Sequence, residues 1–457
     1  MSRARGLEMK RQVKLFFIMI LITISVTGCW DRLELEEQAY VVVIGMDKGV
    51  GNTLNITYQI ANPQGGGGST IGKSEKEPAD EIITVNVPGI ISGRDLLSST
   101  VTRRPTFHHV DTLIVGSELA KEDDFFYFLE AALRDRQLRR EIFFIVSKET
   151  AEDFIRNNSP KLETRPHKYY QFMKNRWEET GLVGVSTIHR FLQRTEGGEG
   201  LYLSIYAANP ENKKENKNKK EDQKDEGKEK GNKSGEEDEN IKMKSLVPKK
   251  MGYEDEYLAG DIPMRGGNPT QIIGSAIFKD GKMIGTLNGE ETRLSLLLRP
   301  SFKVTSMITT YPDPIKEGYR ITTRAVKLEE SMLKMNLSGE KLIIRETVPL
   351  IIDVLTIPSA INYVESKEMQ KLLMTSIEKQ LNKDAKELIS KLQNKFKGDP
   401  FIWHLSARKK FMTITEYDNY DWKGKFPDAD IEVKFQVQLR GFEKREMPPQ
   451  MERIRDD

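Results

Sequence analysis

Cys29 is the only cysteine in the 457-residue chain, and the residues before it follow the order of a protein-export signal. Five basic residues come first: Arg3, Arg5, Lys10, Arg11 and Lys14. An apolar run, Leu15–Ile22, follows and continues with small hydroxyl residues to Val26, and Thr27 and Gly28 then precede the thiol. A basic segment, a short apolar segment and small residues before a cleavage point are typical of a secretory signal peptide. We therefore expect cleavage after Gly28.

A thiol in this position resembles the bacterial lipobox, in which the cysteine receives a diacylglycerol and becomes the first residue of the mature protein. The alternative is a transmembrane anchor with an incidental cysteine. The apolar stretch, however, is about 12 residues long, whereas a spanning helix needs about 20. We therefore predict that Cys29 is lipidated and that the chain contacts the lipid bilayer through it.

Composition limits the classes of function that remain. Removing residues 1–28 takes away five Lys or Arg and one Glu, so the formal net charge changes from +2 to −2. A nearly neutral chain has no overall basic field, which argues against nucleic acid as a partner. A lone cysteine excludes an internal disulfide and the thiolate-rich zinc and iron–sulfur sites. No second apolar run of 18 residues follows, so the remainder is expected to lie outside the membrane.

The residues that usually carry catalysis do not form a recognisable set. The motifs HExxH, GxSxG, GxxxxGK[ST] and GxGxxG are absent from the sequence. His108 and His109 are adjacent, and on a strand they would point to opposite faces instead of forming a pair of ligands. The other histidines stand apart, at His167, His189 and His404. We predict no catalytic residue, no metal ligand and no cofactor, and hence a non-enzymatic protein.

Apolar patterning predicts two folded regions on either side of a charged segment. In the first region, strand-like runs such as 39–46, 112–115 and 142–146 alternate with helix-like runs such as 117–134, which predicts a mixed α/β or α+β domain. Residues 209–245 are almost entirely polar and charged, and they read as a solvated linker or insertion. A charge-dependent docking tail is the alternative. The glycine-rich tract 65–69 predicts a loop.

The second region shows antiparallel signals and one long helix. Asp280-Gly281 between two apolar runs predicts a hairpin over residues 271–285. Apolar residues recur every three or four positions over 364–397, which predicts a long amphipathic helix. We expect this helix to pack on an alternating strand at 429–439.

Several runs of the sequence resemble the Ger(x)C family of spore germination lipoproteins. The N-terminal ones are GCWDR (28–32) and VIGMDK (43–48). Later runs follow in the family's order: HHVDTLIVGSELA (108–120), FLEAALRDRQLRREIFFIV (128–146), GSAIFKDGKMIGTL (274–287) and WKGKFPDADIEVKFQVQLRG (422–441). The similarity covers nearly the whole chain.

The resemblance implies an α+β fold of three mixed α/β domains with largely antiparallel sheets and one long C-terminal amphipathic helix. We expect the following division: 1–28 signal peptide, 29–207 N-terminal mixed α/β domain, 208–259 charged linker or insertion, 260–348 middle β-rich domain, and 349–445 C-terminal domain with the long helix packed on a sheet.

The resemblance also implies a function. It identifies the chain as a non-enzymatic lipoprotein subunit of a nutrient germinant receptor, with membrane-embedded receptor subunits as partners. Its location would be the extracytoplasmic face of the spore inner membrane. Direct binding of a small molecule by this subunit stays open. A solute-binding lipoprotein of a transporter is the alternative, because it would share the lipid anchor and the extracytoplasmic location.

Overall fold

The computed structural model describes residues 13–20, 34, 37–62, 80–163, 165–198, 200–210 and 255–442. Cys29, the predicted cleavage site, the glycine-rich tract and nearly all of the charged segment lie outside these residues. Residues 13–20 are helical and exposed. Within the described part of the chain, no helix combines the length and apolar character that crossing a membrane requires.

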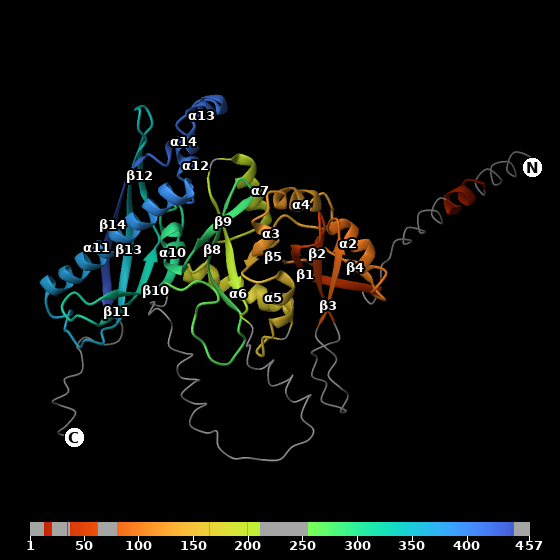
Figure 1. Cartoon of the computed structure of the whole chain (residues 1–457), viewed down its shortest axis with the longest axis horizontal. Coiled ribbons are helices and arrows are strands. Elements are labelled where there is room, and N and C mark those ends of the chain that lie inside the picture. Colours follow the sequence, from red (N-terminus) through yellow and green to blue (C-terminus); the bar gives the residue numbers. More distant parts are fainter. Residues whose placement is uncertain are drawn as a thin grey trace, which may run out of the picture.

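Two sheets lie side by side along the long axis of the molecule (Figure 1). The larger has nine strands among the described residues, in the order β3-β2-β1-β5-β6-β7-β8-β9, with β4 also paired to β1. The strands are β1 Gln38–Lys48, β2 Leu54–Ala61, β3 Asp80–Val87, β4 Arg104–Thr106, β5 Thr112–Gly116, β6 Phe143–Ser147, β7 Tyr202–Ala208, β8 Gln271–Lys279 and β9 Lys282–Leu287.

The centre of this sheet corrects one expectation. Strands β1, β5, β6 and β7 run parallel, and only the outer pairs β1–β2, β2–β3, β7–β8 and β8–β9 are antiparallel. The prediction of largely antiparallel sheets is therefore wrong for this sheet. The physical reason is the alternation of strands and helices between residues 104 and 208, because parallel neighbours need helical crossovers between them.

Helices cover both faces of the larger sheet. On one face lie α2 Ile90–Leu97, α3 Ser117–Ala120, α4 Phe125–Ala132 and α7 Ile188–Gly197. On the other face lie α5 Ala151–Asn157 and α6 Pro166–Thr180. Burial on both faces explains why strands such as FFIVS and TLIVG are buried throughout and mostly apolar. The mixed α/β character predicted from the sequence is confirmed.

The expected single helix over 117–134 is two helices, α3 and α4. The sequence Lys121-Glu122-Asp123-Asp124 lies between them. Asp favours helix caps and turns over helix interiors, because its side chain competes with the backbone for hydrogen bonds. Two ion pairs also contact the residues of this break: Lys48 pairs with Glu122 at 2.7 Å, and Lys282 pairs with Asp123 at 2.8 Å.

The predicted hairpin is β8–β9, and it is confirmed. Asp280 and Gly281 have φ of 52° and 84°, the left-handed conformation that a two-residue turn of this kind needs. β8 also pairs antiparallel with β7, so the hairpin completes the larger sheet. The sheets thus do not follow the predicted boundary at residues 259/260, and the division into three domains stays a prediction.

The smaller sheet has the order β10-β11-β13-β12, with β14 paired in parallel to β13. Its other pairings are antiparallel, as predicted for this region. The strands are β10 Val304–Pro312, β11 Arg320–Lys327, β12 Met332–Asn336, β13 Ile343–Thr356 and β14 Asp430–Phe442. β14 alternates exposed and more buried residues, as expected for a strand with one face towards a core.

A long helix, α11 Lys367–Lys391, covers one face of this sheet (Figure 1). It lies within the predicted range 364–397 and is about 37 Å long. The Ser366 side chain caps its first turn. Its buried residues recur at helical spacing: Leu373, Ile377, Leu381, Ala385, Leu388 and Ile389. Two α11 side chains, Glu378 and Asn382, also accept backbone N–H groups of β14, so the helix packs on this strand.

We call the larger sheet with its covering helices the larger unit, and the smaller sheet with α11 the smaller unit. Shorter elements complete the smaller unit and connect it to the larger sheet. They are the π-turn η2 Leu392–Phe396 and helices α10 Gly289–Leu297, α12 Trp403–Arg408, α13 Ile414–Tyr420 and α14 Trp422–Lys425. Leu203 and Ile277 of the larger sheet, and Leu201 just before β7, belong to the same buried cluster as the core of the smaller sheet. The two units therefore share a continuous core.

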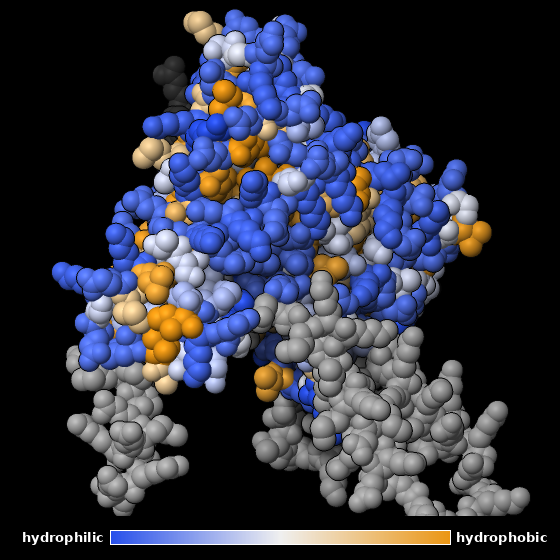
Figure 2. Space-filling model, turned by 60° about the vertical axis from the view of Figure 1, so that its left-hand side comes forward, coloured by the Kyte–Doolittle hydropathy of each residue, from blue (hydrophilic) through white to orange (hydrophobic). Residues whose placement is uncertain are grey.

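The surface on the α11 side is mostly hydrophilic, with scattered apolar patches (Figure 2). The most exposed large apolar side chains of the described C-terminal half are Met412, at 95% exposure, and Ile414, at 62%.

Candidate functional site

The sequence-predicted site residue, Cys29, lies outside the described residues. The described structure becomes continuous eight residues after it, at Glu37, and β1 begins at Gln38. β1 is buried along most of its length and pairs with three other strands. The segment that carries Cys29 therefore leads directly into the core of the larger sheet.

The histidine pair lies in a turn, not on a strand as the sequence interpretation assumed. His108 and His109 follow β4 and are both exposed. The His109 ring contacts the Tyr40 ring edge-on, with 5.2 Å between ring centroids. The isolated His404 is buried, and its Nδ1 lies 3.0 Å from an Asp399 carboxylate oxygen. None of these histidines meets another, so the structure does not bring them together as ligands.

Asp47, in the run VIGMDK, has a structural task that sequence reasoning missed. It lies near the end of β1, and its two carboxylate oxygens accept the backbone N–H groups of Ala151 at 2.7 Å and Glu152 at 3.0 Å. These groups begin α5, so Asp47 caps that helix from a distant strand. Burial raises the pKa of Asp47 to about 6, while the two backbone hydrogen bonds act in the opposite direction.

Two glycines allow Asp47 and α5 to lie close to the neighbouring strands. A Cβ at Gly116 would lie 2.1 Å from Asp47 Oδ1, and a Cβ at Gly45 would lie 2.9 Å from Ile155 Cδ1. Both distances are shorter than a van der Waals contact allows. The glycines of VIGMDK and TLIVG therefore serve the packing of α5 against β1 and β5, and they form no phosphate-binding loop.

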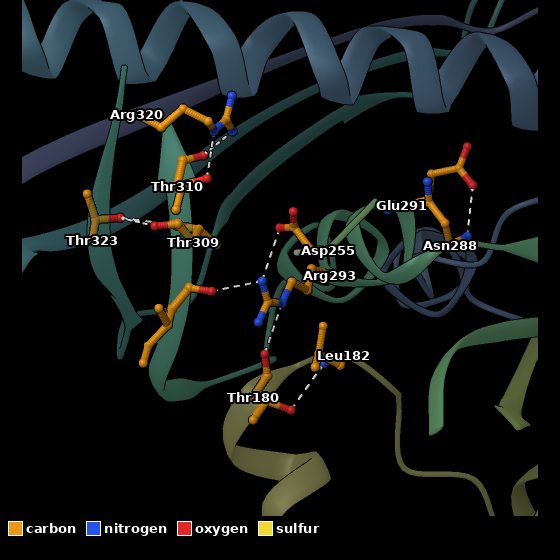
Figure 3. A network of polar contacts seen from close by, with 11 residues as sticks. Thr180, Leu182, Asp255, Asn288, Glu291, Arg293, Thr309, Thr310, Arg320 and Thr323 are labelled. Atoms are coloured by element: carbon orange, nitrogen blue, oxygen red, sulfur yellow. Dashed lines mark hydrogen bonds and ion pairs between the residues drawn. The ribbon is translucent and has the colours of Figure 1, made fainter. Parts of the chain in front are cut away.

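A pocket of about 240 Å³ lies where the two units meet. Its walls come from α10, β10, β11, α11 and the segment before β8 that contains Asp255 and Glu256. Leu294, Met307 and Leu381 form part of its apolar lining. Figure 3 shows the polar network at this junction, with α11 above it.

Arg293 holds the junction together. Its Nη1 donates to Asp255 at 3.0 Å and to the Ile308 backbone carbonyl at 2.9 Å, and its Nε donates to the Thr180 carbonyl at 3.1 Å (Figure 3). The Arg293 and Asp255 side chains are only 7% and 13% exposed, so water screens this ion pair weakly. One guanidinium thus links the end of α6, α10 and β10.

The pocket has an excess of carboxyl groups. Burial, together with neighbouring carboxylates of which Asp384 is the strongest, raises the pKa of Glu290 to about 8. Burial also raises the pKa of Asp384, although Gln380 donates two hydrogen bonds to it at 2.8 and 3.0 Å. The cationic Arg320 donates to the Thr310 hydroxyl and carbonyl at 2.7 and 2.6 Å. The pocket can therefore accept hydrogen bonds from a small polar molecule.

The same residues offer no evident catalytic machinery. The described residues contain no group of three or more His, Cys, Asp or Glu that could hold a metal ion. The carboxyl groups of the pocket meet arginine, glutamine and each other, and the known contacts place no nucleophile beside a general base.

Lys327 forms a second buried polar centre in the smaller unit. It is fully buried, and its ammonium group donates to the carbonyls of Leu297 and Arg299, each at 2.9 Å, and of Pro300 at 3.3 Å. These carbonyls lie at and just beyond the C-terminal end of α10, where a cation is favoured. Burial lowers the pKa of Lys327 and raises that of Glu346, and their mutual attraction opposes both shifts.

Comparisons with known proteins match an N-terminal and a C-terminal part of the chain, and the strands β8 and β9 of the larger sheet fall almost entirely in the second match. The model for the N-terminal domain of spore germination proteins matches residues 31–235, and the model for the C-terminal part of spore germination B3/GerAC-like proteins matches residues 273–443. The chain belongs to the GerAC-like family of spore germination proteins.

Relatives within the GerAC-like family come from Bacillus subtilis (strain 168). Spore germination protein KC is 29% identical over 154 residues, which are 33% of this chain and 38% of KC. That alignment thus spans well under two thirds of the relative. Spore germination protein B3 is 21% identical over 437 residues, 93% of this chain and 97% of B3. The crystal structure of the GerBC protein has 16% identity and a TM-score of 0.48, covering 87% of this chain and 96% of that one.

Sequence reasoning could not find the pocket, because its lining comes from segments more than 100 residues apart. One local signal was available. Asn288 and Glu291 form a capping box at the start of α10, with the Asn288 side chain accepting from Glu291 N at 2.8 Å. That pattern marks the start of the helix that carries Glu290 and Arg293, although it does not show what they meet.

Proposed function

We propose that this chain is a lipid-anchored, non-enzymatic subunit of a spore nutrient germinant receptor. In this proposal, the diacylglycerol on Cys29 attaches it to the extracytoplasmic face of the spore inner membrane. There it assembles with membrane-embedded receptor subunits and is required for the response to a germinant.

The observation that carries this proposal is the family membership, which rests on matches over residues 31–235 and 273–443. The sequence before Cys29 supports the anchor, because a basic segment, a short apolar segment and small residues precede the only thiol. The short distance from Cys29 to β1 supports peripheral attachment with little spacer.

The alternative, a solute-binding lipoprotein of a transporter, receives less support. Such a protein would need two lobes that open about a hinge around a cleft. Here Leu203 and Ile277 of the larger sheet, and Leu201 just before β7, are buried in the core of the smaller unit. Opening the two units would expose this shared apolar surface to water, which costs about 25 cal/mol for each Å².

Deleting the gene in the native spore-former tests the proposal. We expect loss of germination with at least one nutrient and restoration by the wild-type gene. A Cys29→Ala gene should restore it poorly, because the chain would not reach its membrane partners. Normal germination of the deletion strain with every nutrient tested would contradict the proposal.

A further inference from the structure

One edge of the larger sheet collects the N-terminal ends of four strands. β1 runs parallel to β4 and β5, and β5 runs parallel to β6. Parallel neighbours place their N-terminal ends at the same edge of a sheet. Residues 103–111 lead into β5, and residues 133–141 lead into β6, so these two segments meet at the edge where β1 begins.

Direct contacts confirm that the two segments form one surface. Phe107 N donates to the Gln137 side chain at 3.0 Å, and Arg139 Nη2 lies 3.5 Å from the Val110 carbonyl. His109 reaches β1 through its ring contact with Tyr40. We call residues 103–111 and 133–141 the basic edge.

The basic edge carries an excess of positive charge although the mature chain as a whole is slightly acidic. It contains six arginines against three Asp or Glu residues, together with His108 and His109. Among the described residues, Arg134 pairs with Glu130 and Asp135 pairs with Arg94. Three exposed arginines, Arg136, Arg139 and Arg140, pair with no carboxylate in the described part of the chain.

The basic edge is also the end of the sheet that the chain reaches from Cys29. Gln38, the first residue of β1, pairs with Arg104. Nine residue steps separate Cys29 from Gln38, and a fully extended chain of that length spans about 30 Å. A lipid on Cys29 therefore keeps the basic edge within about 30 Å of the bilayer surface, so its arginines can reach anionic headgroups, whose attraction acts within a Debye length of about 8–10 Å.

We propose that the basic edge binds the phosphate groups of anionic phospholipids, so that the larger sheet stands with the N-terminal end of β1 against the bilayer. The orientation rests on the proposed anchoring through Cys29, whereas binding of headgroups does not require it. Arg136, Arg139 and Arg140 make the main contacts, because a guanidinium can bind phosphate through two parallel hydrogen bonds.

Vesicle sedimentation of the mature chain carrying Cys29→Ser tests this contact without the lipid. All strands and core clusters that the structure describes lie after residue 37, so this chain keeps them. The probes are vesicles of phosphatidylcholine alone and of phosphatidylcholine with an equal share of phosphatidylglycerol. We expect binding to the anionic vesicles only, weakened by salt.

A charge-matched pair of variants separates a specific edge from general electrostatics. R136Q/R139Q/R140Q should raise the lipid concentration for half-maximal binding by about tenfold or more. K371Q/K379Q/K386Q removes the same charge from exposed positions on α11 and should leave binding unchanged. Absence of binding by the parent chain, or equal loss in both triple variants, would overturn the proposal. The Cys29 lipid is tested separately by mass spectrometry, so either idea can fail alone.

Discussion

The Asp47 carboxylate on β1 accepts the backbone N–H of Ala151 at 2.7 Å, across 104 residues of sequence. The same side chain accepts the N–H of Glu152, so one acidic residue satisfies two of the unpaired donors at the start of α5. This contact joins β1, the first strand after the proposed anchor, to α5, which follows β6. It gives the Asp of VIGMDK a structural role as the cap of α5.

Removing this cap should destabilise the larger sheet. Asp47→Ala leaves two largely buried backbone donors without an acceptor, so we expect a loss of roughly 2–4 kcal/mol in unfolding free energy. Asp47→Asn should lose less, because its amide oxygen still accepts one of the two bonds. Urea denaturation of the mature chain measures both variants.

Asp124→Ala is the matched control for Asp47. Asp124 precedes α4, and its side chain forms no capping hydrogen bond. We expect a change within about 0.5 kcal/mol for this variant. If Asp47→Ala is no more destabilising than Asp124→Ala, the cap has no energetic importance.

Lys327 should be required for the stability of the fold, because its buried charge is compensated by three carbonyl groups and by Glu346. Lys327→Met removes the donor for three carbonyls and leaves Glu346 buried without its cationic partner. We expect a loss of roughly 3–5 kcal/mol. At alkaline pH the double variant K327M/E346Q should be more stable than K327M, since the buried carboxyl group of residue 346 can then no longer ionise. Lys334→Met, at an exposed position on β12, is the control. Equal melting temperatures for K327M and K334M would refute this account.

Glu290 makes the stability of the junction depend on pH. Its pKa is about 8 in the folded chain and near 4.5 in the unfolded chain. The folded state therefore binds more protons between these values, and the contribution of Glu290 to stability is complete below about pH 4.5 and lost as pH rises through 8. Glu290→Gln removes this loss.

Melting curves between pH 5 and 9 measure the effect. Relative to wild type, E290Q should gain roughly 2 kcal/mol over this range. This is less than the full pKa difference implies, because solvent screens a partly exposed carboxyl group. Glu340→Gln, in an exposed turn, controls for the change in net charge. If the stabilities of wild type and E290Q change with pH in parallel, the pKa of Glu290 is not raised in the folded chain.

The mass of the mature protein tests the anchor at Cys29. We expect the membrane-extracted protein to begin at Cys29 and to carry a diacylglycerol, because the preceding residues resemble a lipobox. Cys29→Ala should remain as the uncleaved, unlipidated precursor. Finding the diacylglycerol on the Cys29→Ala protein would place the attachment elsewhere.

Local patterns predicted the elements that depend on neighbouring residues. The Asp280-Gly281 turn could be predicted from the sequence because two residues set its conformation. Helix α11 could be predicted because its apolar residues repeat at helical spacing. The parallel centre of the larger sheet was not readable, since β1 meets β5 only after about 65 intervening residues. For the same reason, the sequence showed neither the partners of Asp47 nor the carboxyl groups around Glu290.

The break between α3 and α4 shows where pattern reasoning misled. The apolar spacing of residues 117–134 fits one helix, but it gives no weight to Asp123 and Asp124 in the middle. Lys48 pairs with Glu122 and Lys282 pairs with Asp123 at this break. The turn preference of Asp thus interrupts a helix that the apolar spacing alone predicted as continuous.

The central claim is that this chain is a subunit of a membrane-embedded receptor, and co-purification tests it most directly. An affinity-tagged full-length chain, expressed from its own locus, is extracted from spore membranes in mild detergent, and the proteins retained with it are identified by mass spectrometry. We predict enrichment of multi-spanning membrane proteins in constant proportion to the tagged chain, strongly reduced for Cys29→Ala. Recovery of the wild-type chain from the membrane without any enriched membrane protein would contradict the account.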